Sequence, residues 1–171
     1  ISAYGASKLA DEGLLSARAH SHDLTVWTFR FANVVGPGLR GAVIPDFIEK
    51  LTENPETLTI LGNGLQEKSY LHIDDCVDAM LHIVAHADSA VNTYNLGTRT
   101  TTSVDRIAAI VADEMDLDPD YEYTGGDRGW TGDVPKMRLS IEKLSALGWE
   151  PELSSDRAVR RSTRELIDEL C

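Results

Sequence analysis

The sequence predicts an α/β fold, in which helices and strands alternate along a chain of 171 residues. Residues 6–19 are rich in Ala, Leu, Arg and Glu, which favour helix. Residues 24–31 follow with the β-branched and aromatic alternation that is typical of a strand. Amphipathic helical segments and short β runs then continue to alternate up to residue 170. The length is sufficient for one domain with a substantial core.

The remaining elements follow from local patterns. Apolar spacing predicts a helix at 43–51, stopped by the Asn-Pro pair at 54–55. Two β runs on either side of Gly-Asn-Gly at 62–64 indicate a hairpin. Asp74 or Asp75 is expected to cap the buried helix that follows. Further on we predict a strand at 93–97 and a helix at 104–115 that is capped from residues 100–103. A short helix at 140–147 ends at Gly148, and a last helix occupies 156–170.

Composition and charge exclude several classes of function. No apolar run approaches the length of a membrane span, so we expect a cytoplasmic protein with no membrane partner. The net charge of −12 argues against nucleic acid as a partner, because such a surface repels phosphate at long range. The many acidic residues also suggest a halophilic protein, since salt screens their repulsion. An ordinary acidic surface that maintains solubility is the alternative.

The cysteines and histidines show no metal or disulfide pattern. Cys76 lies in an apolar helical run and Cys171 is the last residue, so neither a disulfide framework nor a metal knuckle is predicted. His82 and His86 are one helical turn apart and could provide two metal ligands. The sequence places no third ligand beside them, and we therefore predict no metal site.

The pentapeptide Tyr-Gly-Ala-Ser-Lys occupies positions 4–8. In a helix, Tyr4 and Lys8 stand one turn apart on the same face, which places an ammonium group beside a phenol. The positive charge favours the phenolate form, so Tyr4 would be a usable proton acceptor. The alternative is a tyrosine at the start of a helix next to a solvated lysine, because this spacing also arises by chance.

Together with four later segments, this pentapeptide resembles the extended short-chain dehydrogenase/reductase superfamily. The similarity is greatest to its NAD-dependent nucleotide-sugar epimerases and dehydratases, in particular the UDP-glucose 4-epimerase group. The later segments are the Arg-x-x-Asn-x-x-Gly-Pro loop at 30–37, the long motif at 58–75, the strand end and cap at 93–103, and the glycine-rich loop at 125–135.

The resemblance implies NAD as the cofactor and assigns roles around it. Tyr4 would be the acid/base that moves the proton of a sugar hydroxyl, and Lys8 would hold the nicotinamide ribose. Phe31 and Val34 would lie on the cofactor side of the loop after the strand, and Asn33 would reach the substrate. The alternative for Asn33 is a turn in which its side chain caps the chain.

The resemblance also implies a UDP-sugar as the substrate. Val43 would line the cleft, and Thr59 and Leu61 would lie against uracil. Lys68 replaces the diphosphate-binding arginine of the family motif Gly-Asp-Gly-x-Gln-x-Arg-Asp-Phe. A lysine neutralises phosphate as a point charge but cannot form the bidentate fork of an arginine, and a plain surface lysine is the alternative.

The glycine-rich loop at 125–135 combines exposed backbone amides with an arginine and a tryptophan, which suits a diphosphate ligand. From the resemblance we assign Arg128 to phosphate and Asp133 to the nucleotide. A flexible glycine-rich loop with an incidental arginine is the alternative.

The resemblance implies the C-terminal part of a doubly wound, Rossmann-like parallel sheet plus a small α/β substrate-binding lobe, with 1–171 as a single unit. We expect that no strand in the chain is followed by Gly-x-Gly-x-x-Gly or Gly-x-x-Gly-x-x-Gly, the arrangements that let a backbone approach a pyrophosphate at a helix start. We therefore expect the C-terminal portion of a longer enzyme, without its N-terminal dinucleotide-binding segment of on the order of 100 residues or more. Such a portion is expected to be inactive alone.

The implied activity is NAD-dependent epimerisation at C4 of UDP-glucose or UDP-galactose through a 4-keto intermediate. The complete enzyme is expected to be a homodimer that pairs through the helix carrying Tyr4. A nucleotide-sugar 4,6-dehydratase or reductase is an alternative, because the residues that distinguish these reactions would precede residue 1. A non-catalytic domain that binds a nucleotide sugar or a partner chain is a second alternative.

Overall fold

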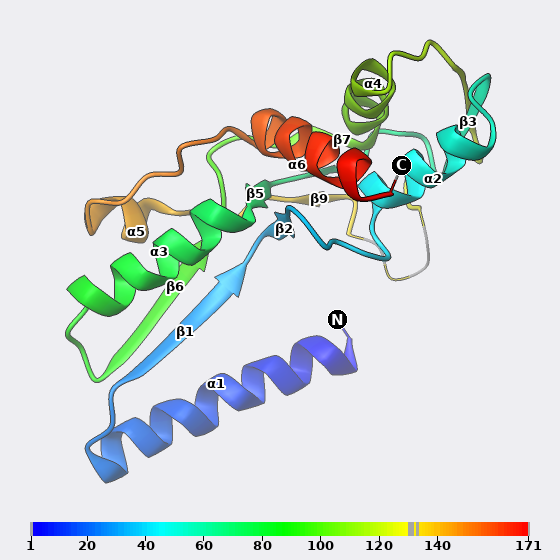
Figure 1. The fold of residues 1–171 in the computed structure, drawn as a ribbon. Helices are drawn as coiled ribbons and strands as arrows, with labels where there is room; N and C mark the ends of the chain where they lie inside the picture. Colours follow the sequence, from blue (N-terminus) through cyan, green and yellow to red (C-terminus); the bar gives the residue numbers. More distant parts are fainter. Residues whose placement is uncertain (1, 130–131, 133, 171) are drawn as a thin grey trace.

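The computed structural model describes residues 2–129, 132 and 134–170 and shows helices packed with short, mostly parallel strands (Figure 1). Its helices are α1 (Ala3–His22), α2 (Val43–Glu53), α3 (Ile73–His86), α4 (Val104–Glu114), α5 (Glu142–Ala146) and α6 (Ser155–Leu170). Its strands are β1 (Val26–Phe31), β2 (Asn33–Val35), β3 (Thr57–Ile60), β4 (Glu67–Lys68), β5 (Tyr70–His72), β6 (Val91–Leu96), β7 (Thr102–Ser103), β8 (Asp120–Tyr123) and β9 (Lys136–Met137). The predicted helices are confirmed, with ends that differ by a few residues.

Helix α1 runs antiparallel to β1, to which the chain returns directly after Asp23 (Figure 1). Ser2 caps the helix, since its hydroxyl accepts a hydrogen bond from the Gly5 N–H at 3.1 Å. A bidentate ion pair joins Arg30 of β1 to Glu12 of α1, with nitrogen–oxygen distances of 2.9 and 2.6 Å. The hydrogen bond from Arg30 lowers the pKa of Glu12. Ala19 is the one buried residue of α1.

Two parallel strand pairs carry the Rossmann-like part of the fold. β1 pairs with β6 from Val26 opposite Val91 to Phe31 opposite Leu96, and β2 pairs with β5. Trp27 and Phe29 of β1 pack into a core with α3, whereas Arg30 contacts α1. Because side chains alternate across a strand, the two helices cover opposite faces of this sheet. The predicted doubly wound architecture is confirmed in this part.

The hairpin predicted around Gly-Asn-Gly is wrong. β3 pairs in parallel with β8, while β4 pairs with β7 and β9. Gly62 and Gly64 adopt positive φ angles of 83° and 76°, which glycine tolerates best. The Gly62 N–H donates to the Thr124 hydroxyl at 2.8 Å, and its carbonyl accepts from the Gly125 N–H at 2.9 Å. These bonds tie the turn to the end of β8, so the chain leaves β3 without pairing back onto it.

The start of α3 also differs from expectation, because the cap is a histidine and not an aspartate. Nδ1 of the buried His72 accepts a hydrogen bond from the Asp74 N–H at 3.2 Å. Its Nε2 therefore carries the hydrogen and donates to Glu165 of α6 at 2.9 Å. Asp74 and Asp75 lie in the first helical turn, where negative charge interacts favourably with the helix dipole. The predicted cap of α4 is confirmed, with Ser103 accepting from the Arg106 N–H at 3.1 Å.

Two hydrophobic cores hold the elements together. One joins α2, α4 and α6 to β3 and β5, and it contains among others Phe47, Leu58, Ile107 and Leu166. The other joins α3 and α5 to β1 and β6 around Ile83, Leu96 and Leu144. Within the described part of the chain, no helix is both long enough and apolar enough to cross a membrane.

Candidate functional site

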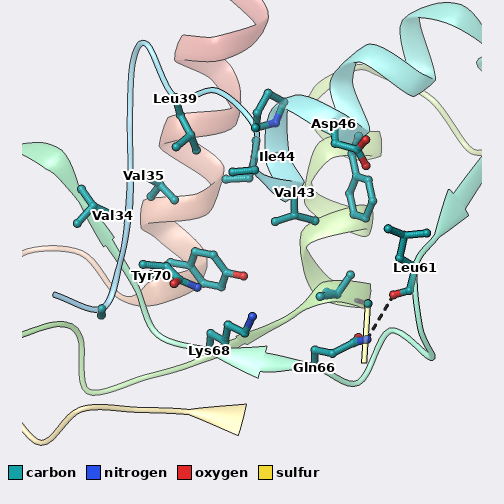
Figure 2. A pocket seen from close by; sticks show the side chains of 18 of the residues that line it. Val34, Val35, Leu39, Val43, Ile44, Asp46, Leu61, Gln66, Lys68 and Tyr70 are labelled. Atoms are coloured by element: carbon teal, nitrogen blue, oxygen red, sulfur yellow. Dashed lines mark hydrogen bonds between the residues drawn. The ribbon is translucent and has the colours of Figure 1, made fainter. Parts of the chain in front are cut away.

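A pocket of about 750 Å³ lies between the loop after β2, the start of α2 and the strands β4 and β5 (Figure 2). The size is typical of a small-molecule site. Its lining residues are Ala32, Asn33, Val34, Val35, Leu39, Gly41, Ala42, Val43, Ile44, Pro45, Asp46, Phe47, Glu49, Leu61, Gln66, Lys68, Tyr70, Val104 and Gly129. The structure thus brings together five of the residues that the sequence assigned to ligands: Asn33, Val34, Val43, Leu61 and Lys68.

One wall of the pocket is an extended segment that presents every second side chain. Gln66, Lys68 and Tyr70 line the pocket, while Ser69 points the other way and bonds to Thr98. Asn33 lies directly opposite Tyr70 in the parallel pairing of β2 with β5. The Asn33 amide, the Lys68 ammonium and the Tyr70 phenol therefore belong to one polar wall. The sequence assigned no role to Gln66 or Tyr70, although their two-residue spacing from Lys68 is a signal for a shared face.

The amide of Gln66 is buried and half paired. The residue is 2% exposed, and its Nε2 donates to the Leu61 carbonyl at 3.3 Å (Figure 2). Its Oε1 is buried without a hydrogen-bond partner among the described residues. An unpaired buried acceptor costs about 1–3 kcal/mol, so such groups usually meet a partner. In a pocket, a donor on the ligand can supply that partner.

The opposite wall is the loop from β2 into α2. It reads Gly-Pro-Gly-Leu-Arg-Gly at 36–41, a Gly-x-Gly-x-x-Gly pattern between β2 and α2, so the expectation that no strand in the chain is followed by this pattern is wrong. Gly38 and Gly41 have positive φ angles of 74° and 63°, and the loop leads directly to Ala42, which caps α2 without a side-chain bond. The backbone N–H groups at such a helix start favour an anion.

The charges on the pocket wall are few. Lys68 is the only cation among its described lining residues, and Asp46 and Glu49 are the carboxylates. Asp46 is already neutralised in part by Lys50, whose Nζ lies 2.7 Å from its Oδ2. A diphosphate could therefore lie between Lys68 and the start of α2, where Asp46 of the first helical turn is already paired with Lys50.

Tyr4 and Lys8 lie on one face of α1, as predicted, with the lysine Nζ 5.9 Å from the centre of the phenol ring. Lys8 also pairs with Asp11 at 3.3 Å. Tyr4 is 73% exposed, and neither residue lines the pocket. Tyr4 lies about 12 Å from the contact between Glu12 and Arg30, measured along α1 toward its N-terminus. Asn33 lies about 10 Å further along the strand direction, so both approach the same end of the sheet.

Three further predicted site residues, Phe31, Thr59 and Arg128, do not line the pocket. Phe31 is exposed at the end of β1, and Thr59 is exposed on β3. The Arg128 side chain is exposed. Its backbone packs against Gly62, because a Cβ added to Gly62 would lie 3.1 Å from the Arg128 carbonyl. The next residue, Gly129, lines the pocket. Asp133 lies outside the described residues. These assignments stay predictions.

The two remaining sequence candidates have ordinary surroundings. The rings of His82 and His86 stack with centres 4.1 Å apart, and each makes a hydrogen bond to a backbone carbonyl. Across the described ranges, no group of three or more His, Cys, Asp or Glu side chains could hold a metal ion. Cys76 is buried and not in a disulfide, and burial raises the pKa of its thiol.

A parallel α/β sheet with a ligand pocket beside it, and with a Tyr-Lys pair near one end, defines a protein of the short-chain dehydrogenase/reductase type. Residues 1–97 match the family model of the NAD dependent epimerase/dehydratase family. The chain belongs to this NAD-dependent family.

Individual relatives agree with this assignment. A putative UDP-glucose 4-epimerase from Methanocaldococcus jannaschii is 28% identical over 165 residues, covering 94% of this chain and 52% of the relative. A crystal structure of a UDP-galactose 4-epimerase superposes with a TM-score of 0.87 at 37% identity, covering 98% of this chain and 54% of that one. A UDP-glucose 4-epimerase from Thermotoga maritima, solved with UDP-glucose, gives a TM-score of 0.85 at 28% identity, with coverage of 100% and 55%.

Relatives with another reaction match the same span. The dTDP-D-glucose 4,6-dehydratase of Mus musculus is 27% identical over 164 residues, which are 93% of this chain and 46% of the relative. The chain spans about half the length of the curated relatives it matches. The comparisons therefore give the family and not the reaction within it.

Proposed function

We propose that these residues form the nucleotide-sugar-binding part of an NAD-dependent epimerase that inverts C4 of a UDP-hexose. The observation that carries this proposal is the single pocket wall on which Asn33, Lys68 and the unpaired amide oxygen of Gln66 converge. The similarity to UDP-galactose 4-epimerase at 37% identity supports the choice of substrate. UDP-glucose and UDP-galactose are the proposed pair of substrates.

In this proposal each wall of the pocket has a separate task. The diphosphate lies between Lys68 and the backbone N–H groups at the start of α2. Asn33 bonds a hydroxyl of the nucleotide sugar, and Leu61 and Val43 supply apolar contact to its rings. We propose that Thr59 of β3 contacts the nucleotide from one side. Arg128 and Asp133 of the loop at 125–135 are proposed to close over it. Binding that is spread over the diphosphate and the base orients the sugar for reaction.

Tyr4 is the proposed acid/base and Lys8 its electrostatic partner. In its phenolate form Tyr4 takes the proton of the sugar C4 hydroxyl, and the ammonium 5.9 Å from its ring centre stabilises the phenolate before the transfer. When bound, NAD would supply the acceptor for the C4 hydride. After the 4-keto sugar has turned in the pocket, Tyr4 returns the proton to the C4 oxygen as C4 takes back, on its other face, the hydride that bound NAD would hold in the interval. The inverted alcohol is then formed.

Four residues are proposed to face the nicotinamide end of NAD. Tyr4, Lys8, Phe31 and Val34 lie toward the carboxyl end of β1, where open parallel sheets bind such ligands. The glycine-rich loop at 36–41 borders the pocket assigned to the nucleotide sugar, so it is not available for a second pyrophosphate. Among the described residues we find no other such turn. We propose that the pyrophosphate of NAD is held by residues outside 1–171 and that this chain alone has no turnover.

The test begins with binding to the chain as it exists. Isothermal titration with UDP-glucose, GDP-mannose and the free sugar should show saturable binding of UDP-glucose and none of the free sugar. Adding UDP-galactose and NAD should give no UDP-glucose. In a complete protein that contains these residues, Tyr4→Phe should lower kcat by about 100-fold or more while the Kd for UDP-glucose stays similar. Absence of UDP-glucose binding, or turnover by the chain alone, contradicts the proposal.

The 4,6-dehydratase alternative is supported by the similarity to the mouse enzyme. Product analysis of the complete protein separates the two reactions, because an epimerase yields a C4 epimer and a dehydratase yields a 4-keto-6-deoxy sugar. A non-catalytic binding domain predicts instead that Tyr4→Phe leaves the biological readout unchanged.

A homodimer of the complete protein is proposed on the basis of α1. Its Leu9 and Leu14 are 69% and 67% exposed, which leaves apolar surface on α1 that a partner can cover. Pairing of two copies of α1 would cover them. Light scattering of the complete protein, with Leu9→Glu as the disrupting variant, measures this directly, and a monomeric wild type refutes it.

A further inference from the structure

Lys68 and Tyr70 point into the pocket from adjacent positions on the same face of one extended segment (Figure 2). Two residues along a strand span about 7 Å, so an ammonium and a phenol hydroxyl at this spacing can approach different oxygens of one phosphoryl group. Ser69 between them is fully buried on the other side, where its hydroxyl oxygen accepts a hydrogen bond from the Thr98 N–H at 3.0 Å. That bond fixes which way the two pocket residues face.

The phenol ring of Tyr70 is held firmly. The residue is 5% exposed and belongs to the core formed with α2, α4 and α6. Its backbone N–H donates to the buried Ser155 hydroxyl at 3.1 Å, and Asn33 lies opposite it across the pairing of β2 with β5. A buried phenol places its apolar ring in the core and its hydroxyl at a polar surface. In this structure that surface is the pocket (Figure 2).

The pair Lys68 and Tyr70 offers what a lysine alone lacks. A lysine contributes one compact charge, whereas an arginine presents two parallel donors in a rigid fork. The motif to which residues 58–75 are similar has Arg and Phe at these two positions, and this chain has Lys and Tyr. Relative to that motif, this chain loses the second N–H donor of the arginine fork and gains the neutral hydroxyl of Tyr70 on the same face.

We propose that the Tyr70 hydroxyl and the Lys68 ammonium together bind one phosphoryl group of the ligand's diphosphate. This inference rests on the proposed function, since it assigns a contact within the nucleotide-sugar pocket. The phenol hydroxyl adds a second donor to a pocket whose described lining residues include one cation, Lys68, and two carboxylates. Tyr70 is thus a ligand-binding residue that acts on the phosphate and not on the base.

The experiment measures binding of UDP and of uridine to the chain by isothermal titration. Tyr70→Phe removes only the hydroxyl and should weaken UDP about 5- to 10-fold, while uridine changes by less than about twofold. Lys68→Met should weaken UDP further and abolish the effect of Tyr70→Phe, because the two donors act on one group. In the double variant K68R/Y70F, the arginine fork should restore UDP affinity to within about threefold of wild type.

Tyr121→Phe is the matched control, since Tyr121 is a partly exposed tyrosine on β8 outside the pocket. It should leave both ligands unaffected, and circular dichroism confirms folding of every variant. Equal UDP affinities of wild type and Tyr70→Phe, with wild type still preferring UDP to uridine, overturn this inference alone. A wild type that binds UDP no better than uridine overturns the proposed function as well.

Discussion

Both carboxylate oxygens of Glu169 lie 3.1 Å from the backbone nitrogen of Gly38, and they accept its N–H. Glu169 is in the last turn of α6, and Gly38 is in the loop that borders the pocket. Arg40 of the same loop lies 3.6 Å from the same carboxylate. The C-terminal helix therefore holds one wall of the ligand site in place, across a separation of 131 residues.

Removing this contact should affect binding more than folding. Glu169→Ala should weaken UDP-glucose about 3- to 10-fold, because the loop must then be ordered at the expense of binding energy. Its thermal midpoint should change little, since the contact is at the surface. Asp168→Ala, a change at the exposed neighbouring residue, is the control. The idea fails if the two variants have the same Kd in isothermal titration.

The unpaired Gln66 amide oxygen gives a second prediction. Gln66→Met removes a buried orphan acceptor together with the bond to the Leu61 carbonyl, so the free energy of unfolding should change by less than about 1 kcal/mol. The affinity for UDP-glucose should fall about 5- to 20-fold, because the ligand loses its acceptor. Urea denaturation and titration measure the two effects. A large loss of stability with unchanged affinity would mean that the amide is only structural.

A comparison of Gly64 with Gly38 distinguishes the stability cost of backbone strain from the cost of a steric clash. Their φ angles are similar, at 76° and 74°, but a Cβ on Gly64 would lie 1.7 Å from Oδ1 of Asp105, whereas a Cβ on Gly38 meets nothing within 4 Å. Gly38→Ala should cost about 1 kcal/mol of unfolding free energy, and Gly64→Ala about 2–3 kcal/mol. Adding Asp105→Ala to Gly64→Ala should remove the excess. Chemical denaturation tests this, and equal costs for both glycines would contradict it.

Glu114 of α4 should make stability depend on pH. Hydrogen bonds from Arg164, at 2.6 Å, and from Arg160 hold the pKa of Glu114 below its ordinary value of 4.5. Because the folded pKa is lowered, this stabilisation is complete above about pH 4.5 and is lost as the pH falls through the folded value. Glu114→Gln should therefore cost about 1–2 kcal/mol at neutral pH and much less near pH 3.

The control for Glu114 is Glu150, whose pair with Arg99 is about half exposed on both sides, at 53% and 50%. Exposed pairs contribute little, so Glu150→Gln should shift the urea midpoint only slightly at either pH. If Glu114→Gln costs the same at both pH values, the ion pair is not the source of the effect.

The sequence by itself determined the features that depend on near neighbours. The helical run that places Tyr4 and Lys8 on one face, the Ser103 cap and the β run that ends before Asn33 were all predictable, because periodicity and capping act within a few residues. A two-residue alternation likewise contained the information that Gln66 and Tyr70 share a face with Lys68.

Only the tertiary structure decided which distant groups meet. It paired β3 with β8 in place of a hairpin, capped α3 with His72, and brought Glu169 to Gly38. A strand edge or an N–H group accepts any partner of suitable geometry, so a local pattern cannot specify which one arrives. That choice follows from packing the two cores, and it is what turned separate motifs into one pocket.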